Sequence, residues 1–236
     1  MSLSVVIPAF NEAPLIAAAI TDLHAALRGQ FDDFEVIAVD DASTDGTGEV
    51  LYALAQQFPW LQVVRHPRNL GHGAAILTGY RLSRKRHIFQ LDSDRQFWPT
   101  DFWRLYAKLD QAELIVGIRE PRRDPFYRRL LSHLLNLANR LLFGQRLRDA
   151  NSPFRLMHRD FLRRHLPHIP PTFSAPNLLL SLFAKRDNTL IEAPVRHRAR
   201  PAGTSTLIRL SLLRFGSKAL LHLIVFRLRD WPHLTF

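Results

Sequence analysis

The chain has 236 residues, and its 47% of hydrophobic residues indicate a sizeable core and argue against intrinsic disorder. It has no cysteine, which excludes disulfides and thiolate chemistry. Residues 1–115 carry 10 basic and 14 acidic side chains, a net charge of −4, whereas residues 116–236 carry 22 and 7, a net charge of +15. This asymmetry indicates that the second half faces something anionic, such as nucleic acid, a lipid headgroup or a phosphorylated substrate.

The first half of the chain alternates short apolar segments with segments of helical period. We expect strands over residues 3–8, 34–39, 61–65, 87–91 and 115–117, and helices over residues 12–27, 47–58 and 73–83. Strands that alternate with helices of this length indicate βαβ units, and therefore an α/β fold with a mainly parallel sheet. Ligands of such sheets bind beyond the carboxyl ends of the strands.

Polar side chains follow four of these predicted strands. They are Asn11, Glu12, Asp40, Asp41, Arg68, Asn69, Asp92 and Asp94. Asp92 and Asp94 are two residues apart at a strand end, so both carboxylates reach one small volume, where they can hold a divalent cation against a diphosphate. Aspartates after strands are also typical turn formers and helix caps.

Two basic, leucine-rich segments follow, and we expect amphipathic helices over residues 127–148 and 207–229. Such helices can lie in a bilayer interface with their arginines at the headgroups, or they can simply cover the sheet as core elements. The first residues lack the features of a secretory signal, and no run of 18 uncharged apolar residues occurs. We therefore expect neither a signal peptide nor a clear transmembrane span.

Five motifs occur in a fixed order along the chain: IPAFNE at 7–12, VDDASTDGT at 39–47, RNLGHGAA at 68–75, DSDRQ at 92–96 and GIR at 117–119. In this order they resemble the inverting family 2 glycosyltransferases with a GT-A-type nucleotide-sugar-binding fold, and within them the dolichol-phosphate mannose synthase group, which charges polyprenyl phosphates. The resemblance runs from residue 4 to about residue 206. It implies a transferase domain over residues 1–206, including the helix at about 127–148, and a basic membrane-interface segment over residues 207–236.

The resemblance also implies which residues bind the donor. Mg²⁺ or Mn²⁺ would be held by Asp92, Asp94 and Gln96 of the D-x-D-x-Q pattern, and would stabilise the nucleoside diphosphate leaving group. Arg200, in a segment that resembles the loop R-x-x-G-x-S-K, would contact the diphosphate and complete the catalytic set, although Thr206 stands where the family has lysine. The nucleotide sugar would contact Pro8, Ala9, Asn11, Glu12, Asp40, Asp41, Asp92, Ser93 and Arg200.

For the acceptor, Arg119, Arg128 and Ser132 fall where this group binds the lipid phosphate, and Arg128 and Ser132 are one helical turn apart. A polyprenyl phosphate is already anionic at neutral pH, so its attack needs positioning and leaving-group stabilisation and no general base. A sugar hydroxyl acceptor would need a base, and Asp149 is the first candidate.

Asp149 opens the segment DANSPFR, which resembles the family segment D-x-x-S-G-F-R with Pro153 in place of glycine. Two interpretations of Arg155 at its end stay open, a phosphate ligand and an ion-pair partner of Asp149.

The predicted function is transfer of a hexosyl group from a nucleotide sugar (GDP-mannose or a UDP-sugar) to polyprenyl (dolichyl or undecaprenyl) phosphate. The enzyme would be peripheral or monotopic on the cytoplasmic side of a membrane, or held there by a membrane-protein partner. One alternative is a related transferase with a soluble saccharide, protein or other lipid acceptor. Another is a non-enzymatic membrane or nucleic-acid-binding protein on a degenerate transferase fold. The presence of Asp92, Asp94, Gln96 and Arg200 disfavours this last alternative, so nucleic acid is not the expected partner.

Overall fold

The computed structural model describes residues 2–31, 33–121, 126–201, 209–229 and 231, and of these it leaves the side chains of residues 126–129 and 209–215 undescribed. Within the described residues one seven-stranded sheet has the order β3-β2-β1-β4-β6-β5-β7. Its strands are β1 (Ser2–Ala9), β2 (Asp33–Asp40), β3 (Leu61–Arg65), β4 (His87–Gln90), β5 (Leu114–Arg119), β6 (Arg155–His158) and β7 (Leu190–Val195). Only β6 pairs antiparallel with its neighbours, so the expected α/β fold with a mainly parallel sheet is confirmed.

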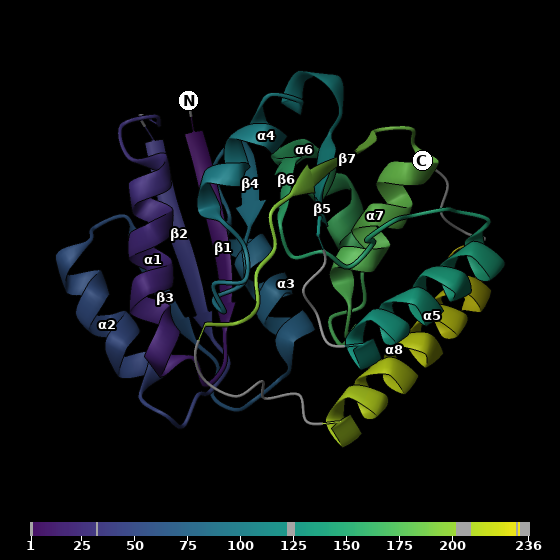
Figure 1. Cartoon of the computed structure of the whole chain (residues 1–236), viewed down its shortest axis with the longest axis horizontal. Helices are drawn as coiled ribbons and strands as arrows, with labels where there is room; N and C mark the ends of the chain where they lie inside the picture. The colour runs from purple at the N-terminus through teal and green to yellow at the C-terminus, as the bar shows by residue number, and fades with distance from the viewer. Residues whose placement is uncertain (1, 32, 122–125, 202–208, 230, 232–236) are drawn as a thin grey trace.

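Helices pack on both faces of this sheet (Figure 1). The α-helices of the described residues are α1 (Ala13–Leu27), α2 (Thr47–Gln57), α3 (His72–Leu82), α4 (Phe102–Tyr106), α5 (Phe126–Phe143), α6 (Arg159–His165), α7 (Pro176–Arg186) and α8 (Arg209–Arg229). Successive strand residues point to opposite faces, so in β1 Val5 and Ile7 join the core formed with α1, α2 and α4, while Val6 joins the core formed with α3, α6 and α7. Burial on both faces explains why the strands read as continuous apolar runs.

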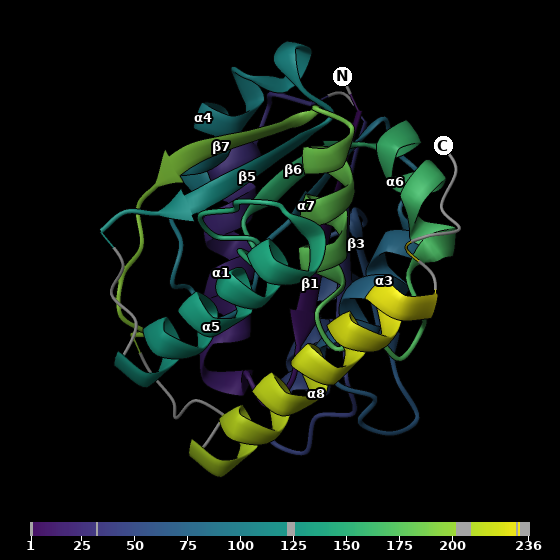
Figure 2. The same cartoon turned by 90° about the vertical axis from the view of Figure 1, so that its right-hand side faces the viewer.

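Helices α5 and α8 lie side by side on the second of these cores (Figure 2). Leu135 of α5 and Ala219, Leu223 and Phe226 of α8 are buried in it. The opposite side of the pair is exposed and apolar, and we call it the α5–α8 outer face. It consists of Leu130, Leu134, Leu137, Leu141, Leu220, Leu221, Ile224, Val225 and Leu228. The two interpretations of these helices are therefore compatible, because one side covers the core and the other faces solvent.

α8 ends at Arg229, as expected, whereas α5 is shorter than expected. α5 ends at Phe143, before the expected residue 148, because Gly144 adopts a φ of 71°, a left-handed conformation that ends a helix and that glycine takes readily. The expected domain boundary at residues 206 and 207 lies outside the described residues.

The sheet brings the polar strand ends together. In register, Ala9 at the end of β1 pairs with Asp40 at the end of β2, and β4 runs parallel to β1 on its other side. The carboxyl ends of these strands point to the lower edge of the sheet in Figure 1, toward the helix pair. This edge is where a parallel sheet binds its ligands.

Candidate active site

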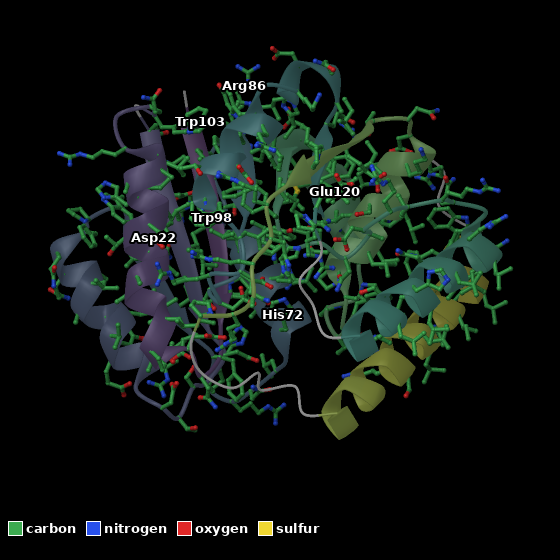
Figure 3. All side chains as sticks on the ribbon, in the orientation of Figure 1. Asp22, His72, Arg86, Trp98, Trp103 and Glu120 are labelled. Atoms are coloured by element: carbon green, nitrogen blue, oxygen red, sulfur yellow. The ribbon has the colours of Figure 1, made fainter. Side chains whose placement is uncertain are left out.

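A cavity of about 500 Å³ extends from the carboxyl ends of β1, β4 and β5 to the facing sides of α5 and α8. His72, at the start of α3, lines the cavity, and Figure 3 shows it between the strand ends and the helix pair. Most residues expected at the donor and acceptor sites line it together: Pro8, Ala9, Glu12, Asp41, Asp92, Ser93, Asp94, Gln96, Arg119, Ser132 and Arg200. Asn11 and Asp40 do not line it, and the side chain of Arg128 lies outside the described residues.

The aspartate pair follows β4 in a tight turn. The turn is closed at Arg95, whose φ is 56°, and the Gln96 backbone N–H donates to Asp94 Oδ1 over 3.0 Å. Gln90 Nε2, from the end of β4, donates to Asp92 Oδ1 over 3.3 Å. Both carboxylates are thus fixed at the floor of the cavity by groups from their own segment.

The charges of the two aspartates are poorly compensated. Burial, and then the negative charge of Asp92, raise the pKa of Asp94 to about 7. Burial also raises the pKa of Asp92, against the opposing positive charges of His72 and Arg119. Two half-buried carboxylates that repel each other are stabilised by a cation between them, so this pair fits Mg²⁺ or Mn²⁺.

The metal coordination would be shared with the substrate. In the described part of the chain, no group of three or more His, Asp or Glu side chains comes together at metal-binding distances. Mg²⁺ is commonly bound by one or two carboxylates, with phosphate oxygens and water as the other ligands. The expected role of Gln96 as a metal ligand stays a prediction. Its buried side chain donates from Nε2 to the backbone oxygen of Arg198 over 3.3 Å, a contact within the protein.

This contact fixes the segment that carries Arg200. Arg198 N–H donates in return to the backbone oxygen of Gln96 over 2.9 Å, which holds the segment beside the aspartate pair. Arg200 then donates from Nη1 and Nη2 to the two carboxylate oxygens of Glu12, over 2.9 and 2.6 Å. Burial raises the pKa of Glu12, against the hydrogen bonds and charge of Arg200. Contact of Arg200 with a diphosphate would therefore replace an existing ion pair.

Asp41 holds the loop between β3 and α3, which forms one wall of the cavity. Its carboxylate accepts backbone N–H bonds from Leu70 and Gly71, both 2.8 Å long, and its Oδ1 lies 2.7 Å from His66 Nδ1. Three of its hydrogen-bonding positions are thus used to hold the loop before α3. Asp41 lines the cavity while it builds the loop around it.

Asp40 and Asn11 support this wall from behind. Asp40 is fully buried, accepts the backbone N–H of Ser43 over 2.9 Å and lies 3.3 Å from Arg65 Nε. Asn11 accepts the backbone N–H of Thr44 over 2.9 Å, which joins the loops that follow β1 and β2. The structure therefore places both residues as supports of the loops that follow β1 and β2, and their expected contact with the nucleoside stays a prediction.

The end of the cavity beside β5 and α5, where the acceptor is expected, contains a two-point ion pair. Arg119, at the end of β5, donates from Nε and Nη2 to the two carboxylate oxygens of Asp149, both over 2.7 Å. Ser132 of α5 and Pro153 line the same end. Thr206, the departure from the family loop, lies outside the described residues.

Arg155 has neither of the roles expected for it. Its side chain is fully buried, does not line the cavity, and donates to the backbone oxygens of Ala150, Ser152 and Asn177 over 2.7–3.1 Å. Its partners are carbonyl groups, and Asp149 pairs with Arg119 instead. The arginine thus fixes the turn after Asp149.

The model of Glycosyl transferase family 2 matches residues 4–166, which is more than half of the chain. The chain belongs to this family. Undecaprenyl-phosphate 4-deoxy-4-formamido-L-arabinose transferases from Edwardsiella ictaluri and Pseudomonas paraeruginosa are 32% and 34% identical to it, over 86% and 89% of its length. The matches cover 62% and 61% of those relatives, so the chain spans less than two thirds of their length.

The fold of this family 2 chain also matches solved structures. Glucosyl-3-phosphoglycerate synthase from Mycobacterium tuberculosis, crystallised with Mn²⁺, UDP and glucosyl-3-phosphoglycerate, superposes with a TM-score of 0.69. The match covers 96% of this chain and 79% of that chain, at 20% sequence identity. The expected family and the GT-A fold class are confirmed.

Some residues of the cavity were not expected from the sequence of this family 2 chain. They are Phe173 and Ser174 from the loop before α7, Asn136 of α5, and Lys218 of α8. The loop carries no motif, so nothing in the sequence signals its position. The sequence indicated Lys218 only as one polar residue of a basic helix. Its position at the cavity depends on how α8 packs against the rest of the protein.

The raised pKa of Asp94 predicts a stability cost in the metal-free protein. A carboxyl whose pKa rises from 3.8 to about 7 on folding destabilises the folded state progressively between about pH 4 and 7, and by a constant amount above. Asp94→Asn removes this cost, so we expect its melting temperature in EDTA to exceed that of the wild type by several degrees at pH 8 and by clearly less at pH 5. Thermal unfolding at the two pH values measures this, and equal melting temperatures at pH 8 would contradict it.

Proposed function

We propose that this chain transfers a hexosyl group from a nucleotide sugar to a polyprenyl phosphate at a membrane surface. The observation that carries the proposal is the single cavity that joins the aspartate pair to the space between α5 and α8. A donor bound at one end and a lipid phosphate bound at the other would meet inside it. The family, and the names of relatives that act on undecaprenyl phosphate, support this choice of acceptor.

At the donor end, Asp92 and Asp94 would hold Mg²⁺ or Mn²⁺, and the solved relative crystallised with Mn²⁺ and UDP supports a metal-bound donor. The cation would stabilise the negative charge that develops on the nucleoside diphosphate as it leaves. Glu12, Asp41 and the loop between β3 and α3 would contact the nucleoside part of the donor. Arg200 would exchange Glu12 for a diphosphate oxygen, which suits the two-point donor geometry of a guanidinium.

At the acceptor end, Arg119, Arg128 and Ser132 would orient the lipid phosphate for attack on the anomeric carbon. Attack by an oxygen that is already anionic needs no base, so positioning is the main contribution of these residues. Arg119 is held in place by Asp149, which fixes the direction of its guanidinium. We infer that this ion pair keeps the acceptor end ordered.

The α5–α8 outer face would lie in the membrane interface. Leu134 is 52% exposed, Leu141 76%, Leu221 59% and Leu228 72%, and a continuous apolar surface of this kind marks an interaction site. The excess of positive charge in the second half would attract anionic headgroups. In the described part of the chain, no helix is long and apolar enough to cross a bilayer.

This predicts that exposed leucines control membrane binding. The double variant Leu134→Glu with Leu221→Glu should bind vesicles of anionic phospholipid at least about ten-fold more weakly, because each buried leucine contributes about 1.5–3 kcal/mol. Tyr52→Glu is the matched control, since Tyr52 is an exposed apolar side chain on α2, away from the outer face. Co-sedimentation with vesicles measures the binding, and unchanged binding of the double variant would exclude the outer face as the membrane contact.

A second candidate is transfer to a hydroxyl acceptor. It is favoured by Asp149, a carboxylate at the acceptor end of the cavity, where a hydroxyl nucleophile would need a base. The two candidates are separated by supplying a panel of nucleotide sugars with either polyprenyl phosphate in vesicles or soluble saccharides. Sugar recovered on the lipid supports the first function, and sugar recovered only on saccharide supports the second.

A further inference from the structure

The acceptor end of the cavity has walls from two helices that are far apart in the sequence. Leu131, Ser132, Leu135 and Asn136 of α5 form one wall, and Lys218 of α8 lines the same space. The two helices run side by side there (Figure 2). The space thus combines apolar side chains, which suit a hydrocarbon chain, with hydroxyl, amide and ammonium groups, which suit a phosphate.

The position of α8, and with it the position of Lys218, is fixed on both sides. Gly216 is buried against α5, and a Cβ atom at this position would lie 2.5 Å from Leu131 Cδ1, so any larger residue would require the Leu131 side chain to move. Further along, Arg227 Nε donates to the backbone oxygen of Leu142 over 2.7 Å. These contacts set which side chains of α8 face the cavity.

The loop before α7 fixes the same stretch of α8 from another direction. Ser174 N–H donates to His222 Nδ1 over 3.3 Å, and His222 lies one helical turn after Lys218. Burial, and then the positive charge of Lys218, lower the pKa of His222, which keeps this ring neutral and able to accept the hydrogen bond at pH 7. His222 therefore acts as an anchor for the helix, and Lys218 is left as the cation beside it.

Lys218 differs from the two arginines of the cavity in its ion-pair partners. Arg119 and Arg200, which also line the cavity, each form a two-point ion pair with a carboxylate. Among the described residues, no carboxylate lies within ion-pair distance of the Lys218 ammonium group. An anion that enters between the helices therefore meets an ammonium group whose charge no carboxylate of these residues neutralises.

We propose that Lys218 is an acceptor-binding residue, whose ammonium group contacts the phosphate of a prenyl phosphate from α8 while Ser132 contacts it from α5. The proposal rests on the proposed function and extends its acceptor site to a helix that the sequence motifs do not include. A hydrogen bond between an ammonium and a phosphate is charge-assisted, and so stronger than a neutral one. The α8 helix would then serve both the membrane contact and the recognition of the acceptor.

The test separates phosphate binding from membrane binding by using two acceptors. Transfer rates are measured with citronellyl phosphate, a soluble short-chain prenyl phosphate, and with polyprenyl phosphate in vesicles. We expect Lys218→Ala to raise the KM for both acceptors about ten-fold, equivalent to about 1.4 kcal/mol, with kcat changed much less. Lys218→Arg should restore most of the affinity. Lys185→Ala, at an exposed lysine of α7 outside the cavity, should leave the KM unchanged.

The outcomes are distinct. An unchanged KM for citronellyl phosphate overturns the proposal, including the case in which only transfer in vesicles is weakened, because Lys218 would then act on the membrane alone. Binding of UDP or GDP with Mn²⁺, measured by calorimetry, should be the same in Lys218→Ala as in the wild type, and a loss would place Lys218 at the donor instead. If the wild type transfers sugar to neither acceptor, the proposed function fails and the proposal fails with it.

Discussion

Asp94→Ala is expected to lower the rate of sugar transfer by about a thousand-fold or more, because it removes a proposed metal ligand and with it the stabilisation of the leaving diphosphate. The variant should keep its fold, since the hydrogen bond that Asp94 accepts lies within its own turn and its negative charge destabilises the metal-free protein. Transfer rate, metal-dependent binding of UDP and GDP by calorimetry, and melting temperature measure the three consequences separately.

The matched control for this variant is Asp110→Ala, which removes an exposed aspartate outside the cavity. It should leave the transfer rate and the metal-dependent nucleotide binding unchanged. Full activity of Asp94→Ala would show that the metal assignment is wrong. Loss of activity together with loss of the folded structure would contradict the prediction that the aspartate pair is a functional and not a structural feature.

Arg155→Met is expected to destabilise the protein by about 3–5 kcal/mol, and to lower its melting temperature by roughly 10 °C. The reason is that the backbone oxygens of Ala150, Ser152 and Asn177 would stay buried without their donor. Burial lowers the pKa of Arg155 to about 10, so the guanidinium remains charged at pH 7 and forms charge-assisted bonds.

Arg164→Met is the control for this substitution. Arg164 pairs with Glu113 and is 49% exposed, so its loss should cost less than about 1 kcal/mol. Chemical denaturation of the two variants and the wild type measures the difference. If Arg155→Met and Arg164→Met lose similar stability, the buried role of Arg155 is contradicted.

The sequence predicted the sheet because its strands are buried on both faces, which leaves a strong apolar signal. It also predicted that Asp92, Asp94, Glu12 and Arg200 lie together, because carboxyl ends of parallel strands share one edge and the motif order matches the family. These predictions depended on local sequence patterns, which can be recognised without knowledge of the tertiary structure.

The features that the sequence did not indicate depend on contacts between distant segments. For Arg155 the sequence left two roles open, a phosphate ligand and an ion-pair partner of Asp149, whereas its burial follows from packing against α7, which no local pattern indicates. Asp40 and Asp41 are adjacent in sequence but differ in position, since one supports the wall and the other lines it. Lys218 lines the cavity because α8 packs against α5, a relation between two helices that the sequence alone does not contain.

The measurement that tests this function most directly is sugar transfer by the wild-type protein to polyprenyl phosphate in vesicles, with a panel of UDP- and GDP-sugars. We predict a lipid-linked sugar from one donor in the presence of Mn²⁺ or Mg²⁺, its loss when EDTA is added, and its return with excess metal. No lipid-linked sugar from any donor, or transfer that EDTA does not diminish, would contradict the proposed reaction.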